Sequence, residues 1–168
     1  MINAYISGIG YYVPENIVKN SELSMKISTS DKWIVERTGI KERRHVNCSG
    51  IGPSDLAIPA VQSALNNANL STKDIDFIVF ATSTPDYYAP GSGCLLQEKM
   101  NFPTIGALDI RMQCSGFIYA LSIAEQYIKS GTYKNILVVG SEVQSTALNL
   151  TDEGRDTAVI FADGAGAA

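Results

Sequence analysis

One cysteine of this sequence, Cys114, stands where a thiol could be activated for nucleophilic attack. It falls between a strand-like segment, "GALDIRMQ", and an amphipathic segment, "SGFIYALSIAEQYIKSG", whose apolar spacing predicts a helix. A thiol at the start of a helix feels the positive end of the helix dipole and nearby unpaired backbone N–H groups, which favour the thiolate. The same groups could stabilise an oxyanion formed by attack on a carbonyl, and Ser115 and Gly116 keep the turn small. The position indicates acyl transfer; the alternative is an inert core thiol, because free cysteines are among the most buried residues.

A second candidate pair, Trp33 and Arg37, lies four residues apart in "SDKWIVERTG". This segment predicts a short helix with Ser30 as its N-cap and Gly39 just past its end, so the two side chains share a face. An aromatic plane can stack on a base, and a guanidinium can bind phosphate. The alternative is a core tryptophan beside a surface arginine.

The other thiols and the single histidine give weaker signals. Cys48, Cys94 and Cys114 are odd in number and lack CxxC spacing, which argues against a disulfide framework and a zinc site. We assign Cys94 to packing and Cys48 to a loop, and we expect no metal. His45 could pair with Cys114, but it follows the charged stretch "KERR", for which a solvated turn is the simpler expectation.

The elements that must position these residues alternate between strand-like and helix-like segments. This alternation predicts an α/β layered fold with a mainly parallel sheet. In the helix that Ser54 would cap, Pro59 falls too far inside for a first-turn proline, so we expect a kink or a later start. Pro90 is expected to open the next helix. The expected strands cover residues 4–14, 74–84, 104–113, 134–142 and 155–168, and the expected helices cover residues 30–39, 54–70, 90–101 and 114–131.

Composition and charge exclude several classes of function. A chain of 168 residues can bury one sizeable core, and 45% hydrophobic with 18% charged residues is ordinary for a soluble globular protein. A net charge of −4 argues against nucleic-acid binding, which needs a basic field. Met1 runs into an apolar segment without a basic region, and no apolar run approaches the ~20 residues of a membrane span. We therefore expect no secretory signal and no membrane insertion, with a reducing cytoplasm as the compartment.

The segment around Cys114, "RMQCSGFIYALSIAEQYIKSG", resembles the nucleophile segment of the 3-oxoacyl-(acyl-carrier-protein) synthase III family of the thiolase superfamily. "STSDKWIVERTGIKERR" resembles that family's segment that contacts coenzyme A. "GIGYYVP" and "AVIFADGAGAA" match its opening strand and its glycine-rich turn. The matches are collinear and span nearly the whole chain. The resemblance implies a thiolase-like fold of layered αβαβα architecture, of which residues 1–168 would be the N-terminal half, because the family's chains are about twice as long.

The resemblance also implies a two-stage reaction. Cys114 would take an acyl group from an acyl-coenzyme A, and malonyl-acyl carrier protein would lose carbon dioxide and attack the resulting thioester in a Claisen condensation. In the family a histidine and an asparagine from the C-terminal half assist the second stage, and neither lies in this sequence. The family pattern implies a homodimer that needs no cofactor beyond its coenzyme A thioester substrate. By itself the chain is expected to acylate slowly at most.

Individual residues carry over by motif. Trp33, Arg37 and Thr29 would line the coenzyme A tunnel, and Arg155 in "TDEGRDTAVIF" lies near a nucleotide-contacting arginine of the family's "TDRGT" motif, with a different local spacing. In "DYYAPGSGC", Ala89 stands where the family often has a bulky residue that reaches into the partner's acyl pocket, which predicts a primer pocket roomier than one for acetyl groups.

Two departures from the family leave alternatives open. Met112 and Gln113 replace small residues before the cysteine and put the subfamily in doubt. The alternatives are a hydroxymethylglutaryl-coenzyme A synthase-like enzyme, a secondary-metabolite acyltransferase, or a non-catalytic thiolase-like binding subunit. A Rossmann dinucleotide site is not expected, because "FADGAGAA" lacks GxGxxG after a first strand.

Overall fold

The structure, a computed structural model, describes residues 2–168 and divides into two compact units. The first unit comprises Met1–Tyr12, Gly52–Glu142 and Gly164–Ala168, and the second comprises Val13–Ile51 and Val143–Asp163. No helix among the described residues is long and apolar enough to cross a membrane.

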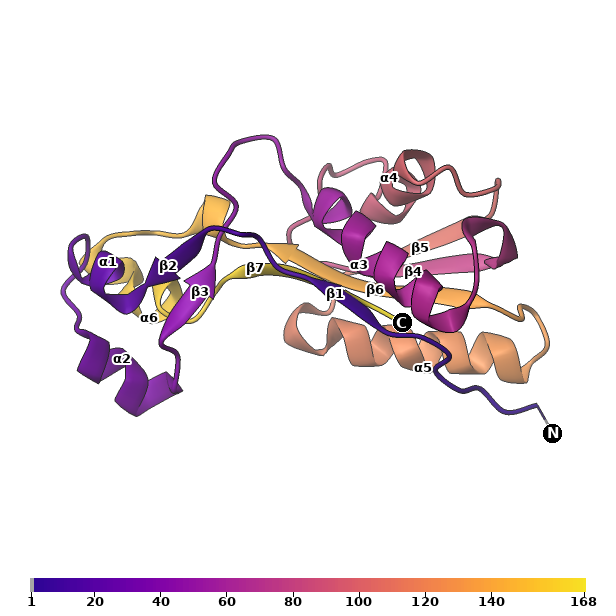
Figure 1. Ribbon diagram of the computed structural model, residues 1–168, viewed down its shortest axis with the longest axis horizontal. Helices are drawn as coiled ribbons and strands as arrows, with labels where there is room; N and C mark the ends of the chain where they lie inside the picture. The colour runs from indigo at the N-terminus through magenta and orange to yellow at the C-terminus, as the bar shows by residue number, and fades with distance from the viewer. Residues whose placement is uncertain (1) are drawn as a thin grey trace. The chain divides into compact units, whose positions relative to one another are not determined.

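The first unit is built on a five-stranded mixed sheet in the order β1-β7-β6-β4-β5 (Figure 1). The central strand β4 pairs in parallel with both of its neighbours. At the other side of the sheet β1 is antiparallel to β7, and Val138 and Ala168 exchange two backbone hydrogen bonds of 2.8 and 2.9 Å, the pattern of an antiparallel pair. The strands are β1 (Gly10–Tyr12), β4 (Phe77–Ala81), β5 (Gly106–Ile110), β6 (Ile136–Val143) and β7 (Asp163–Ala167).

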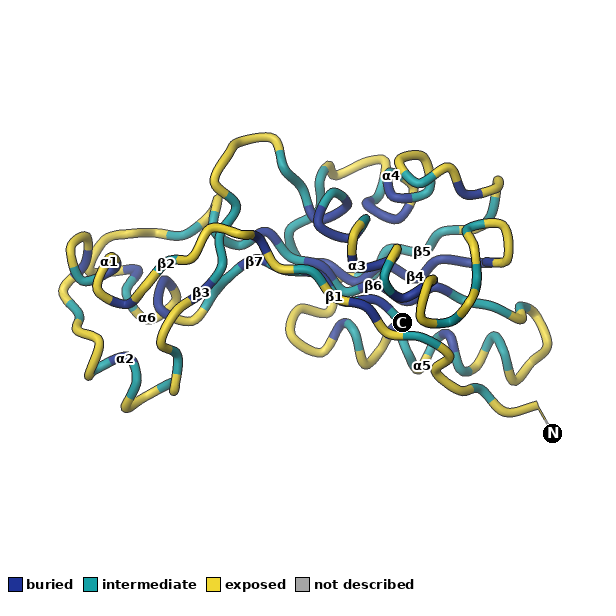
Figure 2. The backbone as a smooth tube through the Cα atoms, viewed as in Figure 1, coloured by how far each residue is buried: buried dark blue, intermediate teal, exposed yellow. Residues whose placement is uncertain are grey.

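Helices cover both faces of this sheet. Helices α3 (Pro53–Ala68) and α4 (Ser92–Lys99) lie on one face, and α5 (Gly116–Lys129) lies on the other (Figure 1). Every residue of β4 is buried, which explains its continuous apolar sequence (Figure 2). The core on the α5 side contains three of the four residues expected to form the apolar stripe of that helix. Phe117, Leu121 and Ala124 pack with Ala120 against alternate residues of β4, whereas the fourth, Ile128, lines a cavity.

Two carboxylates hold the starts of α3 and α4. The Asp109 side chain, from β5, accepts hydrogen bonds from the backbone N–H of Ser92 (2.6 Å) and of Gly93 (2.9 Å). Asp86 accepts from the N–H of Ser54 (3.2 Å) and from its hydroxyl (2.7 Å). Burial raises the pKa of Asp109; the two N–H groups oppose this rise, and the nearby charge of Asp86 adds to it. A desolvated carboxylate thus fixes α4 directly to the sheet.

The second unit contains a two-stranded sheet and three short helices. Its apolar core joins Leu23, Ile27, Ile34, Ala158 and Val159. The elements are β2 (Ile17–Lys19), β3 (Glu42–Arg44), α1 (Asn20–Ser24), α2 (Asp31–Thr38) and α6 (Arg155–Ala158), with 3-10 turns at η3 (Ser145–Ala147) and η4 (Asp152–Gly154); η1 (Thr72–Asp74) and η2 (Gln113–Ser115) belong to the first unit.

The stretch "KERR" is not a solvated turn, because it forms β3 and contains a buried arginine. Arg43 is only 4% exposed. Its guanidinium donates to the carbonyl oxygens of Val18 and Val159 (both 3.2 Å) and to Asn20 Oδ1 (2.7 Å), and burial lowers its pKa. Arg43 therefore ties β3 to α1 and to the end of α6.

Several expected element boundaries were wrong. The first strand is limited to Gly10–Tyr12, the residues that pair with β7. Helix α3 begins after Gly52, whose N–H donates to Asp55 (2.9 Å), because the hydroxyl of Ser54 is engaged by Asp86; Pro59 lies inside the helix, so the later start is also wrong.

Other corrections concern α4 and the glycine-rich end of the chain. Helix α4 begins at Ser92, and Pro90 precedes it. Cys94 on α4 is exposed and is not a packing residue. The segment after Arg155 is first helical, in α6, and the glycine-rich "DGAGA" is the strand β7, not a turn. On the neighbouring β1, glycine is required, because a Cβ on Gly10 would lie 2.1 Å from the carbonyl oxygen of Ala60.

The link between Asp109 and α4 predicts a loss of stability on truncation. Asp109→Ala leaves the N–H groups of Ser92 and Gly93 without their acceptor, so we expect the free energy of unfolding to fall by about 1–3 kcal/mol. Urea denaturation followed by circular dichroism measures this. The exposed Glu98→Ala on the same helix is the control and should change stability by less than about 0.5 kcal/mol. Equal effects of the two variants would contradict the role of Asp109.

Candidate functional site

The predicted nucleophile lies in the turn between β5 and α5, as the sequence indicated. Cys114 is the middle residue of η2, and its side chain is exposed, which contradicts the alternative of a buried inert thiol. The turn is tight: Ser115 donates from its N–H (3.2 Å) and its hydroxyl (3.0 Å) to the carbonyl oxygen of Met112. Gly116 is buried, and a Cβ there would lie 3.2 Å from Cβ of Ala81 on β4. The thiol thus emerges at the carboxyl edge of the parallel strands, directly before the first turn of α5.

The residue before the thiol adopts a rare backbone conformation. Gln113 has φ of +47°, in the left-handed region that costs a non-glycine residue about 1–2 kcal/mol. Such conformations persist where the surrounding structure enforces them, and they are frequent at functional turns. The sequence singled out Gln113 as a departure in residue type, but its backbone strain could not be read from the sequence.

The second unit brings three of the predicted binding residues together around Trp33. The guanidinium carbons of Arg37 and Arg155 lie 4.3 and 4.6 Å from the Trp33 ring centroid, within cation–π range. Helix α2 orients the ring as predicted, because Ser30 Oγ accepts from the N–H of Trp33 (3.1 Å) and Gly39 closes the helix with φ of +74°. The shared face of Trp33 and Arg37 is confirmed, and the fold adds Arg155 to it from 118 residues further along the chain.

Thr29 lies one residue from a polar contact that joins two distant segments. Asp152 accepts from the N–H of Ser28 (2.5 Å) and from its hydroxyl (2.6 Å), and these bonds, with the charge of Arg155, lower the pKa of Asp152. Arg155 also donates to the carbonyl oxygen of Ser28 (3.4 Å). The Thr29 hydroxyl is buried and has no hydrogen-bond partner among the described residues. Thr29 thus follows directly after the residue that contacts Arg155, and its role in binding a ligand stays a prediction.

The remaining candidates are distributed between the units. Ala89 is exposed in the first unit, after the exposed Tyr87 and Tyr88. His45 and Cys48 belong to the second unit, where they line a cavity of about 530 Å³, and Nε2 of His45 is buried without a partner among the described residues. Across residues 2–168, no three His, Cys, Asp or Glu side chains gather as a metal ion would require.

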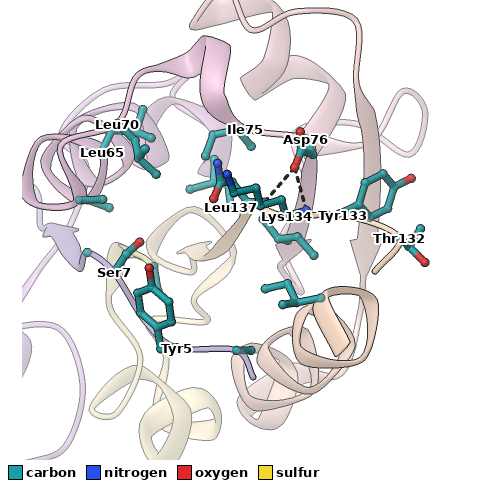
Figure 3. A pocket seen from close by; sticks show the side chains of 18 of the residues that line it. Tyr5, Ser7, Leu65, Leu70, Ile75, Asp76, Thr132, Tyr133, Lys134 and Leu137 are labelled. Atoms are coloured by element: carbon teal, nitrogen blue, oxygen red, sulfur yellow. Dashed lines mark hydrogen bonds between the residues drawn. The ribbon is translucent and has the colours of Figure 1, made fainter. Parts of the chain in front are cut away.

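A cavity of about 730 Å³ in the first unit lies away from this chemistry (Figure 3). Its rim includes Asp76, which precedes β4 and accepts from the N–H of Lys134 (2.8 Å) and of Asn135 (2.9 Å). These residues mark the amino ends of the parallel strands, whereas Cys114 follows the carboxyl end of β5. The cavity is therefore at the opposite edge of the sheet from the thiol.

Sequence reasoning missed four carboxylates that hold helix starts and loops within the two units. Asp86, Asp109 and Glu142 each contact the start of a helix or a loop at the carboxyl edge of the sheet, and Asp152 holds Ser28. The available signal was an acidic residue within or just after an apolar strand, where an unpaired charge would be costly.

The strained turn predicts an unusual response to glycine. Gln113→Gly removes the left-handed penalty, so we expect stability to hold or to rise by up to about 1 kcal/mol despite the greater freedom of the unfolded chain. Gln113→Val, with a β-branched side chain, should lose more than about 1 kcal/mol. Urea unfolding of both variants measures the difference, and a glycine variant less stable than the valine variant would show that the turn is not strained.

Comparison with known proteins gives one consistent family. The profile of 3-oxoacyl-[acyl-carrier-protein] synthase III matches residues 108–168. Beta-ketoacyl-[acyl-carrier-protein] synthase III of Caldanaerobacter subterraneus subsp. tengcongensis is 47% identical over 99% of this chain and 50% of its own length. The synthase III structures from Aquifex aeolicus and Thermus thermophilus are 44% and 38% identical, each with a TM-score of 0.91, and the match covers 99% and 98% of this chain and 52% and 50% of theirs.

The chain spans about half the length of the curated relatives it matches. Within that span the similarity is continuous and takes in the turn that contains Cys114, the Trp33 segment and the mixed sheet. The chain has the thiolase-like fold and belongs to the 3-oxoacyl-[acyl-carrier-protein] synthase III family.

Proposed function

We propose that this chain carries the acyl-accepting half of an acyltransferase that condenses an acyl-coenzyme A primer with malonyl-acyl carrier protein. The observation that carries the proposal is the exposed thiol of Cys114 in the tight turn before α5. The thiolate attacks the thioester carbonyl, the tetrahedral intermediate collapses, and coenzyme A leaves as its thiolate, which takes up a proton. The product is an acyl-cysteine, and this covalent step divides the overall reaction into two easier ones.

The first turn of α5 supports the attack electrostatically. The initial N–H groups of a helix have no intrahelical acceptor, and they concentrate a partial positive charge at its N-terminus. Developing negative charge on the thioester oxygen can be met there without reorganisation of the protein. In the second stage malonyl-acyl carrier protein loses carbon dioxide, and its carbanion displaces the cysteine from the acyl group. The histidine and asparagine implied for this stage lie outside the present sequence.

We assign the nucleotide end of coenzyme A to Trp33, Arg37, Arg155 and Thr29. In the ligand-free chain two guanidinium groups stack on the single tryptophan. An adenine ring can take the place of one guanidinium on the indole, and the displaced arginine is then free to pair with a phosphate. The hydroxyl of Thr29, one residue from the carbonyl that Arg155 contacts, has no partner among the described residues and would give the ligand one neutral hydrogen bond.

We further infer that Ala89 leaves room for a primer longer than acetyl, because its methyl group stands where a bulky side chain would narrow an acyl pocket. The family also supports a homodimer that works in the cytoplasm and uses the coenzyme A thioester as its only small-molecule partner. An acyl series from acetyl- to octanoyl-coenzyme A tests the pocket: preference for acetyl and rejection of longer chains by the whole enzyme would contradict it.

The nucleophile assignment predicts a specific adduct. Incubation with acyl-coenzyme A should add one acyl mass to the chain, measured by intact mass spectrometry, and Cys114→Ala should abolish the adduct. All three cysteines are exposed, so the matched control is Cys48→Ser/Cys94→Ser, which should acylate like the unmodified chain. An equal adduct on Cys114→Ala, or none on the unmodified chain, would refute the assignment.

The unpaired hydroxyl of Thr29 predicts a separation of binding from stability. Thr29→Val removes the hydroxyl at nearly constant volume, and because no internal hydrogen bond is lost, the free energy of unfolding should not fall. The affinity for coenzyme A should drop by roughly 5- to 10-fold, the value of one hydrogen bond. Quenching of the single Trp33 reports binding directly, and Thr29→Ser should retain the affinity. An unchanged affinity in Thr29→Val would remove Thr29 from the site.

A further inference from the structure

A glutamate at the carboxyl end of β6 is held by the loop that follows β4. The Glu142 side chain is half-buried in the first unit. One of its carboxylate oxygens accepts from the N–H of Ser83 (2.7 Å), and the other accepts from the hydroxyls of Thr84 (2.7 Å) and Thr82 (3.4 Å). The Thr82 hydroxyl in turn accepts from the N–H of Thr84 (3.1 Å). The carboxylate of Glu142 therefore binds all three residues of loop 82–84.

The sheet places this loop between Glu142 and the nucleophile turn. In the parallel register Ala81, the last residue of β4, is paired with Gly140 of β6 on one side and with Ile110 of β5 on the other. The loop thus leaves the sheet with the strand that carries Glu142 on one side and the strand that leads to Cys114 on the other.

The loop also contacts the nucleophile side directly. The N–H of Thr82 donates to the carbonyl oxygen of Ile110 (3.2 Å), the last residue of β5. Ala81, the residue directly before the loop, lies close to Gly116, since a Cβ added at Gly116 would lie 3.2 Å from the Cβ of Ala81. Displacement of loop 82–84 would consequently change the wall beside Cys114.

The residues of loop 82–84 carry no charge, whereas the side chain that binds them is a carboxylate. Placing a carboxylate among buried strands carries a desolvation cost, and charge-assisted hydrogen bonds are about twice as strong as neutral ones. One of the three donors is the backbone N–H of Ser83, which cannot reorient as the hydroxyls of Thr82 and Thr84 can, so this bond fixes the backbone of the loop. The carboxylate thus fixes the position of the loop, although its desolvation costs free energy.

We propose that Glu142 is a positioning residue, which acts through loop 82–84 to hold the wall against which the acyl group on Cys114 is oriented. The inference rests on the proposed acyl transfer and deepens it. Orientation of reacting groups governs the rate of the bound complex and leaves the affinity for a remote nucleotide unchanged. Glu142 should therefore alter the rate of acylation at saturation without altering the binding of coenzyme A.

The experiment uses the chain with Cys48→Ser and Cys94→Ser, so that Cys114 is its single thiol. Glu142→Ala removes the anchor, Thr84→Val removes one donor from the loop, and Thr84→Ser keeps that hydroxyl as the matched control. Three quantities are measured: the acylation rate at saturating acyl-coenzyme A, the dissociation constant of coenzyme A from Trp33 fluorescence, and the rate of alkylation of Cys114 by iodoacetamide. Urea unfolding of each variant verifies that it is folded.

Glu142→Ala and Thr84→Val should lower the saturated acylation rate by about tenfold or more, as expected for a misplaced reacting group. The dissociation constant should stay within about twofold, and Thr84→Ser should behave like the parent chain. Alkylation should become faster by about threefold, because a loosened wall admits a small reagent that needs no orientation. A variant that carries both Glu142→Ala and Thr84→Val should be acylated no more slowly than the variant with Glu142→Ala alone, because the two side chains act as one unit.

The outcomes separate this inference from the proposed function. A folded Thr84→Val that acylates and alkylates like the parent overturns the inference, whatever Glu142→Ala does. A parallel loss of affinity and rate also overturns it, because it would show a general disturbance. If the parent chain is not acylated at all, the proposed function fails, and the alkylation rates alone decide whether loop 82–84 forms a wall beside Cys114.

Discussion

The central strand β4 is paired on both edges and covered on both faces, and the rest of the first unit depends on this burial. Parallel pairing with β5 and β6 aligns the ends of three strands at one edge, so that the loop after β4, the turn after β5 and the end of β6 lie side by side. The five residues of this buried strand are all apolar, because a polar side chain there would cost free energy unless it found a hydrogen-bond partner. Polar groups are consequently concentrated at its carboxyl end, where Thr82 begins the loop beside the nucleophile turn.

Carboxylates from neighbouring elements organise this edge. Asp109 reaches from β5 to the start of α4, Asp86 reaches from the loop after β4 to the start of α3, and Glu142 reaches from β6 to loop 82–84. Each satisfies backbone N–H groups that would otherwise be left unpaired near the core. Burial raises the pKa of Asp109 because it disfavours the charged carboxylate, whereas the two N–H partners favour that charged form.

In the second unit, two positively charged side chains lie close to one aromatic ring. Arg37 reaches Trp33 within one helix, whereas Arg155 arrives from the start of α6. Mutual repulsion of two guanidinium groups is offset by the electron-rich ring and by the acidic neighbours Asp152 and Asp156. A buried arginine, Arg43, fastens the end of α6 to β3, and this contact fixes the helix that presents Arg155.

The sequence by itself determined the features that depend on local periodicity and local caps. Four features followed from residues close together in the sequence. These are the helix between Ser30 and Gly39, the apolar strand β4, the apolar stripe of α5 and the place of Cys114 between a strand and a helix. Collinear motif similarity then identified Arg155 as a candidate before its contact with Trp33 was visible. The errors have one physical origin: an N-cap or a strand end was assigned from nearby residues, but distant carboxylates and pairing partners competed for the same groups, as Asp86 does for Ser54 and β7 does for residues 10–12.

Only the tertiary structure decided the contacts between segments far apart in the chain. Nothing in the neighbouring sequence predicts these features. They are the contact of Arg155 with Trp33, the burial of Arg43, the exposure of Cys94 and Cys114, and the hydrogen bonds of Glu142 to loop 82–84. A sequence specifies which side chains are apolar or charged, but the cost of burying a charge is met by whichever donors the fold brings within hydrogen-bonding distance, and that depends on the register and order of the strands.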